Sequence, residues 1–194
     1  MMRPICIMWT ALAALVLTCT ASCSLLAPPE VREPVTYDLG IPEPLALPCK
    51  VQINPFRMDG AARFKMMGRI HGNQLETDEY HRWIMPPGPM LTRYLRMAFS
   101  ESKPACGNKE IISGSILFFE ADYTRKTAVL SVEYEIRSGN SSVPEIRKTV
   151  MLRIPFPEQA ASPQAAFAAA MQKAAAALAD KLRQELDQCV PANK

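Results

Sequence analysis

The chain has 194 residues, of which 48% are hydrophobic and 21% charged, and its formal net charge is only +3. Such a balanced charge gives no electrostatic reason to expect a nucleic-acid partner. The length that remains after the N-terminal segment is enough for one domain with its own hydrophobic core, so the fold requires no metal or disulfide framework.

The N-terminus has the pattern of a secretory signal peptide followed by a lipidation site. Arg3 precedes a mostly apolar run from Ile5 to Thr20, and small residues come immediately before Cys23. This order of charge, apolar core and small residues predicts that residues 1–22 are a signal peptide. We expect Cys23 to become the first residue of the mature chain and to carry lipid on its sulfur.

Other interpretations of the N-terminus stay open at this point. The position three residues before Cys23 is Thr20, where lipidation sites usually have Leu, and Cys19 is a second, weaker candidate. The chain could also be secreted without lipid or keep an uncleaved anchor. The apolar run is shorter than the ~20 residues that a spanning helix needs, which disfavours the uncleaved anchor.

Residues 23–34 contain three prolines and are predicted to be a short extended tether between the lipid and the domain, which we assign to residues 35–190. Short strands are expected at 35–39 and at 49–53, the second because apolar and polar residues alternate there. Residues 64–70 and 74–77 predict two more strands, joined through residues 71–73 as a hairpin or as a looser turn.

The middle of the chain predicts a helix followed by three strands. The prolines that follow Trp83 prevent residues 83–89 from continuing a helix or a central strand. A helix is expected over residues 90–98, because the apolar side chains there fall at helical spacing. Alternating apolar residues then predict an antiparallel meander of three strands, at 110–123, 128–137 and 145–154.

The chain closes with a long predicted helix at residues 164–189, capped by Ser162 and with Pro163 in its first turn. Its apolar stripe is expected to pack on the chain's own sheet rather than on a partner, and consists of Phe167, Met171, Ala174, Leu178, Leu182 and Leu186. These elements predict the α+β class: a single domain with a mixed, largely antiparallel sheet and two main helices packed on it.

The sequence offers no pattern of catalytic or metal-binding residues. His71 and His81 are the only histidines, and the carboxylates between them match no recognised spacing of metal ligands. No serine lies in a nucleophile elbow, and no glycine-rich loop precedes a helix to hold phosphate. We therefore do not expect an enzyme, a cofactor or a metal site.

One apolar segment is a candidate for binding a partner. It places a large aromatic residue and a methionine beside rigid prolines, and consists of Trp83, Ile84, Met85, Pro86 and Pro87. Large aromatic side chains are usually mostly buried, so the favoured interpretation is that the segment fills the core where a strand meets a helix.

The cysteines predict a disulfide without fixing its partners. If Cys23 is acylated, Cys49, Cys106 and Cys189 remain, an odd number in an oxidising compartment. One disulfide and one free thiol is the simplest arrangement, and the pairing stays open. No Cys-x-x-Cys spacing indicates a redox motif or a zinc site.

Several segments together resemble the ABC-type transport auxiliary lipoproteins, the family of PqiC-like proteins (paraquat-inducible protein C). The similarity is carried by Tyr37-Asp38-Leu39-Gly40, by residues 72–83, by the prolines and helix that follow, and by the Ala-rich helix after the meander. It covers essentially the whole mature chain.

The resemblance implies a periplasmic partner of a transport system that contains an ABC permease, an ATPase and an MCE-domain protein bridging the envelope. Such systems are implicated in moving lipids or other hydrophobic molecules between the two membranes of diderm bacteria. The family fold is an α/β domain with helices packed on a mixed sheet, and the family has no catalytic motif to transfer. Ser24, rather than the Asp associated with inner-membrane retention, follows Cys23, so we expect the outer membrane and its periplasmic face.

We therefore expect a lipid-anchored protein that docks or anchors an MCE-type transport system. The edge of the sheet or the loop Trp83–Pro89 is expected to bind the end of the bridging protein. The alternative is a lipoprotein of envelope scaffolding or outer-membrane assembly that binds protein only. A homo-oligomer is compatible with such a role. Neither the cargo nor the direction of transport follows from the sequence.

Overall fold

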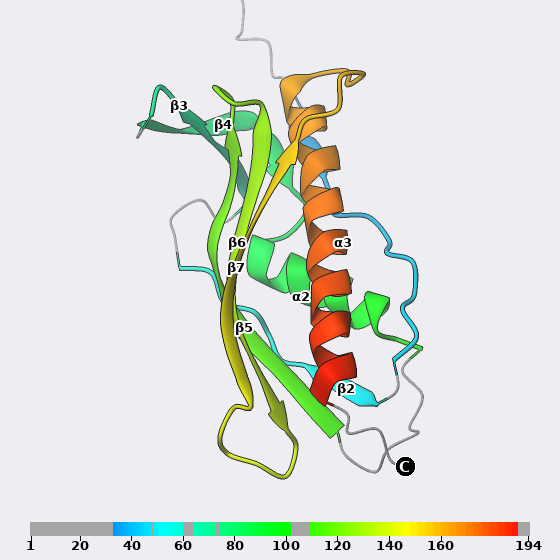
Figure 1. Ribbon diagram of the computed structural model, residues 1–194. Helices are drawn as coiled ribbons and strands as arrows, with labels where there is room; N and C mark the ends of the chain where they lie inside the picture. Colours follow the sequence, from blue (N-terminus) through cyan, green and yellow to red (C-terminus); the bar gives the residue numbers. More distant parts are fainter. Residues whose placement is uncertain (1–32, 48, 60–63, 73, 102–108, 190–194) are drawn as a thin grey trace, which may run out of the picture. The chain divides into compact units, whose positions relative to one another are not determined.

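The centre of the fold is the antiparallel meander that the alternating pattern predicts (Figure 1). The computed structural model describes residues 33–47, 49–59, 64–72, 74–101 and 109–189. Within them, the meander consists of β5 (Lys109–Asp122), β6 (Thr127–Ser138) and β7 (Ile146–Pro155). The observed bounds differ from the predicted ones by one residue. One irregularity interrupts the pairing of β5 with β6, a register shift between Ile116 and Phe118.

Shorter strands extend the sheet on the β5 side. β3 (Lys65–Ile70) pairs antiparallel with β4 (Gln74–Trp83) and parallel with the end of β5, and β1 (Val35–Tyr37) lies parallel to the end of β4. The order is β1-β4-β3-β5-β6-β7, and β2 (Lys50–Ile53) adds to the first part of β5 in parallel. The prediction of a mixed, largely antiparallel sheet is confirmed.

The predicted strands at 64–70 and 74–77 do form a hairpin, which projects from the meander in Figure 1. His71 and Gly72 at its tip both have positive φ angles, 47° and 80°, in the left-handed region that a tight turn requires. β4 continues six residues beyond the predicted end, to Trp83. The extension consists of residues Asp78 to Trp83, in which charged and aromatic residues are mixed without an alternation of apolar with polar positions, so the pattern did not reveal it.

The first helix, α2 (Pro87–Ala98), begins three residues before the predicted start. Pro87 and Pro89 lie in its first turn, where a missing N–H costs no hydrogen bond. Thr92 ties the helix to the chain after β2, since its hydroxyl donates to the Gly88 carbonyl and accepts from the Phe56 N–H, both at 2.8 Å. The prolines therefore start the helix rather than separating it from the strand.

The second helix, α3 (Pro163–Cys189), begins where the sequence predicts. The Ser162 hydroxyl accepts a hydrogen bond from the Ala165 N–H at 3.1 Å, as expected of an N-cap residue. The apolar stripe of the helix is fully buried against the meander, from Phe167 to Leu186. Packing on the chain's own sheet accounts for the stripe.

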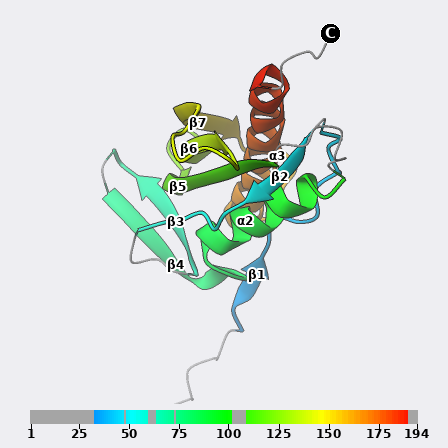
Figure 2. The same cartoon turned by 90° about the horizontal axis from the view of Figure 1, so that it is seen from below.

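Both helices lie on one face of the sheet, as Figures 1 and 2 show. The largest buried side chains fill the layer between them: the ring centroid of Trp83 lies 5.2 Å from that of Phe119 and 5.4 Å from that of Phe167. On β6, every second residue from Ala128 to Ile136 is buried on the helix side. The α+β single domain with two main helices is thus confirmed, and among the described residues no helix covers the other face of the meander.

Candidate functional site: the helix-free face of the sheet

The helix-free face of the meander carries three large apolar side chains in contact with solvent. Leu117 and Phe118 on β5 are 47% and 40% exposed, and Met151 on β7 is 50% exposed. Phe118 pairs with Ser131 of β6, and Ser131 pairs with Met151 of β7. Phe118, Ser131 and Met151 therefore form one row across the sheet. Ser131 is itself 1% exposed, because the two larger side chains flank it. We call Leu117, Phe118 and Met151 the apolar patch.

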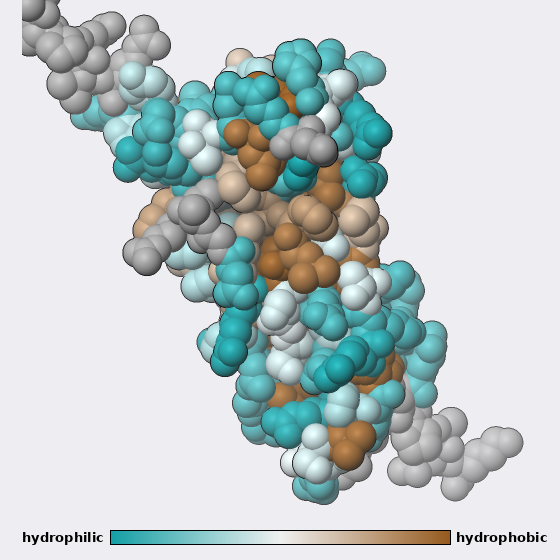
Figure 3. All heavy atoms as spheres, turned by 90° about the vertical axis from the view of Figure 1, so that its left-hand side faces the viewer, coloured by the Kyte–Doolittle hydropathy of each residue, from teal (hydrophilic) through white to brown (hydrophobic). Residues whose placement is uncertain are grey.

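The bulge in β5 adds Leu117 to this patch. The register shift between Ile116 and Phe118 inserts Leu117 as an extra residue, and as a result two consecutive apolar side chains are exposed on a strand whose residues otherwise alternate. Figure 3 shows this face, with apolar atoms gathered in its middle and polar atoms around them. Contiguous apolar surface rimmed by polar residues is typical of an interaction site.

Charged pairs border the patch. Towards β3, the Arg69 Nε donates to the Glu120 Oε1 at 2.9 Å, and this hydrogen bond raises the pKa of Arg69. The Glu120 carboxylate is buried, so this pair satisfies its hydrogen-bonding groups. Farther along the same face, two rows beyond Ser131 and Met151, Arg147 of β7 forms an ion pair with Glu135 of β6. The rim is polar but nearly balanced in charge.

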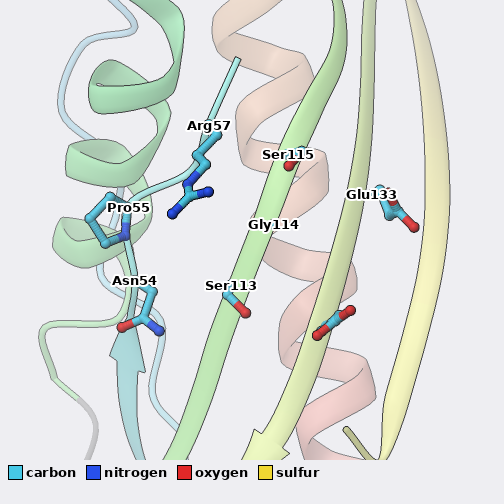
Figure 4. Close-up of a pocket in the computed structure, with 8 residues that line it drawn as sticks. Asn54, Pro55, Arg57, Ser113, Gly114, Ser115 and Glu133 are labelled. Atoms are coloured by element: carbon cyan, nitrogen blue, oxygen red, sulfur yellow. The ribbon is translucent and has the colours of Figure 1, made fainter. Parts of the chain in front are cut away.

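A polar groove of about 410 Å³ continues from the patch along the same face. The chain that follows β2 runs beside β5 here: the Arg57 N–H donates to the Gly114 carbonyl at 3.1 Å, and the Ile116 N–H donates to the Arg57 carbonyl at 2.7 Å. Figure 4 shows how these two segments and β6 supply the lining, which consists of Asn54, Pro55, Arg57, Ser113, Gly114, Ser115, Glu133 and Glu135.

The groove and the patch form one surface, because Ser115 pairs with Glu133 in the next row of the sheet after Phe118 and Ser131. The close packing at the groove requires a glycine: a Cβ on Gly114 would lie 2.4 Å from the Glu133 carbonyl oxygen. A guanidinium, two carboxylates and two hydroxyls suit hydrogen bonding to a polar surface. We call the apolar patch and the polar groove together the docking surface.

The sequence pattern did not reveal this surface, although it contains a usable signal. β5 carries four consecutive apolar residues, 116–119. In a strand with only one buried face, two of these four positions would be polar. β7 likewise has an apolar residue, Met151, between two others that face the core. Apolar residues in excess of alternation mark strands with a second apolar face.

The segment proposed from the sequence for partner binding is mostly inside the protein. Trp83 is 2% exposed and packs between two phenylalanines, and Pro87 is buried in the first turn of α2. Met85 and Pro86 are half-buried, and Ile84 alone of the five is exposed, at 53%. Binding of a partner by this segment stays a prediction, in which Ile84 has the accessible side chain.

The lipidation and disulfide predictions concern residues of which the structure describes few. Cys23 and Cys106 lie outside the described residues, as does the side chain of Cys189, the last residue of α3. Cys49 is buried next to β2. Both the lipidation and the disulfide therefore stay predictions.

The histidines take part in local structure. His71 is exposed at the tip of the hairpin, and the His81 Nδ1 lies 2.9 Å from the Asp78 Oδ2. Partial burial favours a higher pKa for Asp78, but hydrogen bonds from His81, from the Tyr80 N–H and from Gln164 hold that pKa below its ordinary value. Among the described residues, no three His, Cys, Asp or Glu side chains are grouped to hold a metal ion. Within that same part of the chain, no helix has both the length and the hydrophobicity to cross a membrane.

Comparison with solved structures confirms the fold. One crystal structure, of an uncharacterised protein, matches with a TM-score of 0.63 at 10% identity and covers 79% of this chain and 99% of its own. Another, of a Xanthomonas campestris protein assigned to family DUF330, matches with a TM-score of 0.58 at 15% identity and covers 80% of this chain and 92% of its own. At these identities the likeness concerns the fold alone. No curated protein matches the sequence at a significant level.

A family model for the ABC-type transport auxiliary lipoprotein component matches residues 51–182, which extend from β2 into α3 and include the whole docking surface. The match covers more than half of the chain and agrees with the resemblance seen in the sequence. The family is one of transport components and not of enzymes. This protein belongs to the family of ABC-type transport auxiliary lipoproteins.

Proposed function

We propose that the protein is a lipid-anchored accessory of an MCE-type ABC transport system, which docks the envelope-bridging MCE protein at a membrane. The system would move lipids or other hydrophobic molecules across the envelope. Membership of the transport auxiliary family supports the transport role. The observation that carries the docking role is the exposed apolar patch, which the fold itself does not bury.

In this proposal, acyl chains on Cys23 hold the domain at the periplasmic face of the outer membrane. One chain binds a bilayer only marginally, so stable anchoring requires more than one. The proline-bearing tether would separate the domain from the bilayer. The sorting argument from Ser24 supports the outer membrane.

The docking surface suits a protein partner because it combines an apolar centre with a polar periphery. Burying Leu117, Phe118 and Met151 would supply favourable free energy, at about 25 cal/mol for each Å² of apolar surface removed from water. The charged groups of the groove, Arg57 and Glu133 among them, would fix the orientation of the partner rather than the bulk of the affinity.

Purification of the full-length lipoprotein from envelope membranes in mild detergent tests this function. We expect mass spectrometry to find acyl groups on Cys23 and an MCE-domain protein among the co-purifying proteins. An acylated protein that brings down only porins or assembly factors would replace the transport role with the scaffolding alternative. An unmodified N-terminus would refute the lipid anchor.

A further inference from the structure

A second cavity, with a volume of about 850 Å³, lies at the start of α3, away from the residues of the docking surface. It is lined by the β5–β6 turn, the segment between β7 and α3, and the first turn of α3. Its apolar wall consists of Tyr123, Phe156, Pro157, Ala160, Ala161 and Ala166. The mechanism proposed above makes no use of this cavity.

Aromatic rings form the rigid side of the cavity. The ring centroids of Tyr123 and Phe156 lie 6.1 Å apart at a near-perpendicular angle, and Phe156 in turn lies 6.4 Å from the core residue Phe167. Backbone hydrogen bonds hold both residues: the Tyr123 N–H donates to the Arg69 carbonyl at 3.0 Å, and the Phe156 N–H donates to the Lys126 carbonyl at 2.8 Å. The two rings thus pack against each other and against the core, on a backbone that is hydrogen-bonded at both residues.

Small residues leave the opposite side of the cavity open. Ala160 and Ala161 precede the cap residue Ser162, so no large side chain fills the space between Phe156 and the beginning of α3. Pro157 and Pro163 restrict the backbone on both sides of them. The volume falls within the ~300–1,000 Å³ that is usual for small-molecule sites.

Few polar groups face this space, and they lie at its rim. Lys126 and Glu158 are exposed there, and the first turn of α3 adds the partial positive charge of a helix N-terminus. The Ser162 hydroxyl is occupied in capping the helix, and the Gln164 side chain is occupied by Asp78. A sugar or nucleotide would need more polar partners than this, whereas a hydrocarbon chain needs only the apolar wall.

The cavity lies close to the point where the chain leaves the domain towards Cys23. The Gln164 Nε2 donates to the Asp78 Oδ2 at 2.8 Å, Asp78 contacts His81, and His81 is paired with Val35, the first residue of β1. Ten residues separate Cys23 from Pro34, and this segment spans at most ~40 Å when extended. A bilayer that holds Cys23 is thus within reach of the cavity.

We propose that this cavity binds a fatty acyl chain. The acyl chain lies against Tyr123, Phe156 and the alanines, and where it belongs to a phospholipid, the phosphate lies beside Lys126 and the first turn of α3. The acyl chain belongs either to a phospholipid of the bilayer or to the lipid on the protein's own Cys23. The inference rests on the proposed anchoring at a membrane, but it does not depend on which transport protein is bound.

Photolabelling of the full-length lipoprotein in vesicles of phosphatidylethanolamine and phosphatidylglycerol tests the proposal and identifies the source. In one arm, the vesicles contain a phosphatidylglycerol with a diazirine in its acyl chain. In the other arm, the diazirine is in the acyl groups of Cys23 and the vesicles are unlabelled. We expect label on peptides that contain Tyr123, Phe156 or Ala161 in at least one arm. The arm in which these peptides are labelled identifies the source of the bound acyl chain.

Two tryptophan substitutions separate a bound chain from unspecific contact with the bilayer. Ala161→Trp fills the cavity and should abolish the label on Tyr123 and Phe156. Ala176→Trp, at an exposed position of α3 outside the cavity, should leave it unchanged. Lys126→Glu, at the exposed rim, should weaken labelling by phosphatidylglycerol without affecting the core.

Absence of label from the cavity peptides in both arms would overturn the proposal, and so would label that persists in Ala161→Trp. Circular dichroism of each variant checks that it is folded. The readout involves no transport protein, so failure to co-purify an MCE protein would refute the proposed function and leave this inference standing. Conversely, an unlabelled cavity would leave the docking role intact.

Discussion

At the scale of single residues, two neighbours have opposite environments. Trp83 ends β4 inside the core, in contact with the rings of Phe119 and Phe167, whereas the next residue, Ile84, is 53% exposed. The first side chain contributes to stability by filling the layer between sheet and helices. The second has no comparable role in the fold and is available for contact with a partner.

Truncating these two residues should therefore give different results. We expect Trp83→Ala to lower the free energy of unfolding by about 3–5 kcal/mol, because it leaves a large cavity in the core. Ile84→Ala should change it by less than about 0.5 kcal/mol, as surface substitutions usually do. Urea unfolding of the purified lipoprotein in detergent measures the change in the free energy of unfolding for both variants. Equal losses would show that the Ile84 side chain is not free at the surface.

Asp78 links the hairpin to α3 through its bonds to His81 and Gln164. Because its pKa in the folded protein is below the ordinary value of 3.8, its contribution to stability is present above that pH and is lost as the pH falls through the folded pKa. We expect Asp78→Asn to be less stable than the natural protein at pH 7, and the difference to shrink below pH 3.8. Unfolding curves at pH 7 and at acid pH check this; a difference that grows on acidification would contradict it.

At the scale of elements, the start of α3 depends on a single cap. Ser162→Ala removes the acceptor of the Ala165 N–H and should cost about 1 kcal/mol. Ser162→Asp keeps an acceptor and adds a negative charge at the helix N-terminus, so it should be neutral or stabilising. Thermal unfolding of the two variants compares them directly. A destabilised Ser162→Asp would mean that the side chain matters for another reason than capping.

The elements that could be predicted are those with strong periodicity. The meander and α3 were found to within one residue, because alternating residues and a stripe every three or four positions leave little ambiguity. The end of β4 was missed, since its charged and aromatic residues show no alternation of apolar with polar positions. The parallel pairing of β1 with β4 and of β2 with β5 could not be predicted, because strand order depends on contacts far apart in the sequence.

At the scale of the whole molecule, the fold divides into a face that builds the core and a face that is left for contact. The helices cover the first, and the docking surface occupies the second. The sequence predicted the fold and the family but not this surface. Its apolar patch depends on the bulge at Leu117, and a one-residue shift in strand register cannot be read from the alternation alone.

The patch should be dispensable for folding and needed for binding. We expect a double substitution, Phe118→Ser with Met151→Ser, to keep the free energy of unfolding within about 1 kcal/mol of the natural protein, as expected of exposed positions. The same variant should lose most of the co-purifying MCE protein. Val143→Ser, at another exposed apolar residue outside the surface, serves as the matched control and should lose none.

The most direct measurement of the docking claim is site-specific photocrosslinking in intact envelopes. A photoreactive phenylalanine analogue would replace Phe118 in one strain and Val143 in another, with both lipoproteins otherwise complete. We expect a crosslink from position 118 to an MCE-domain protein and none from position 143. A crosslink from position 143 alone, or crosslinks from position 118 only to proteins outside a transport system, would contradict it.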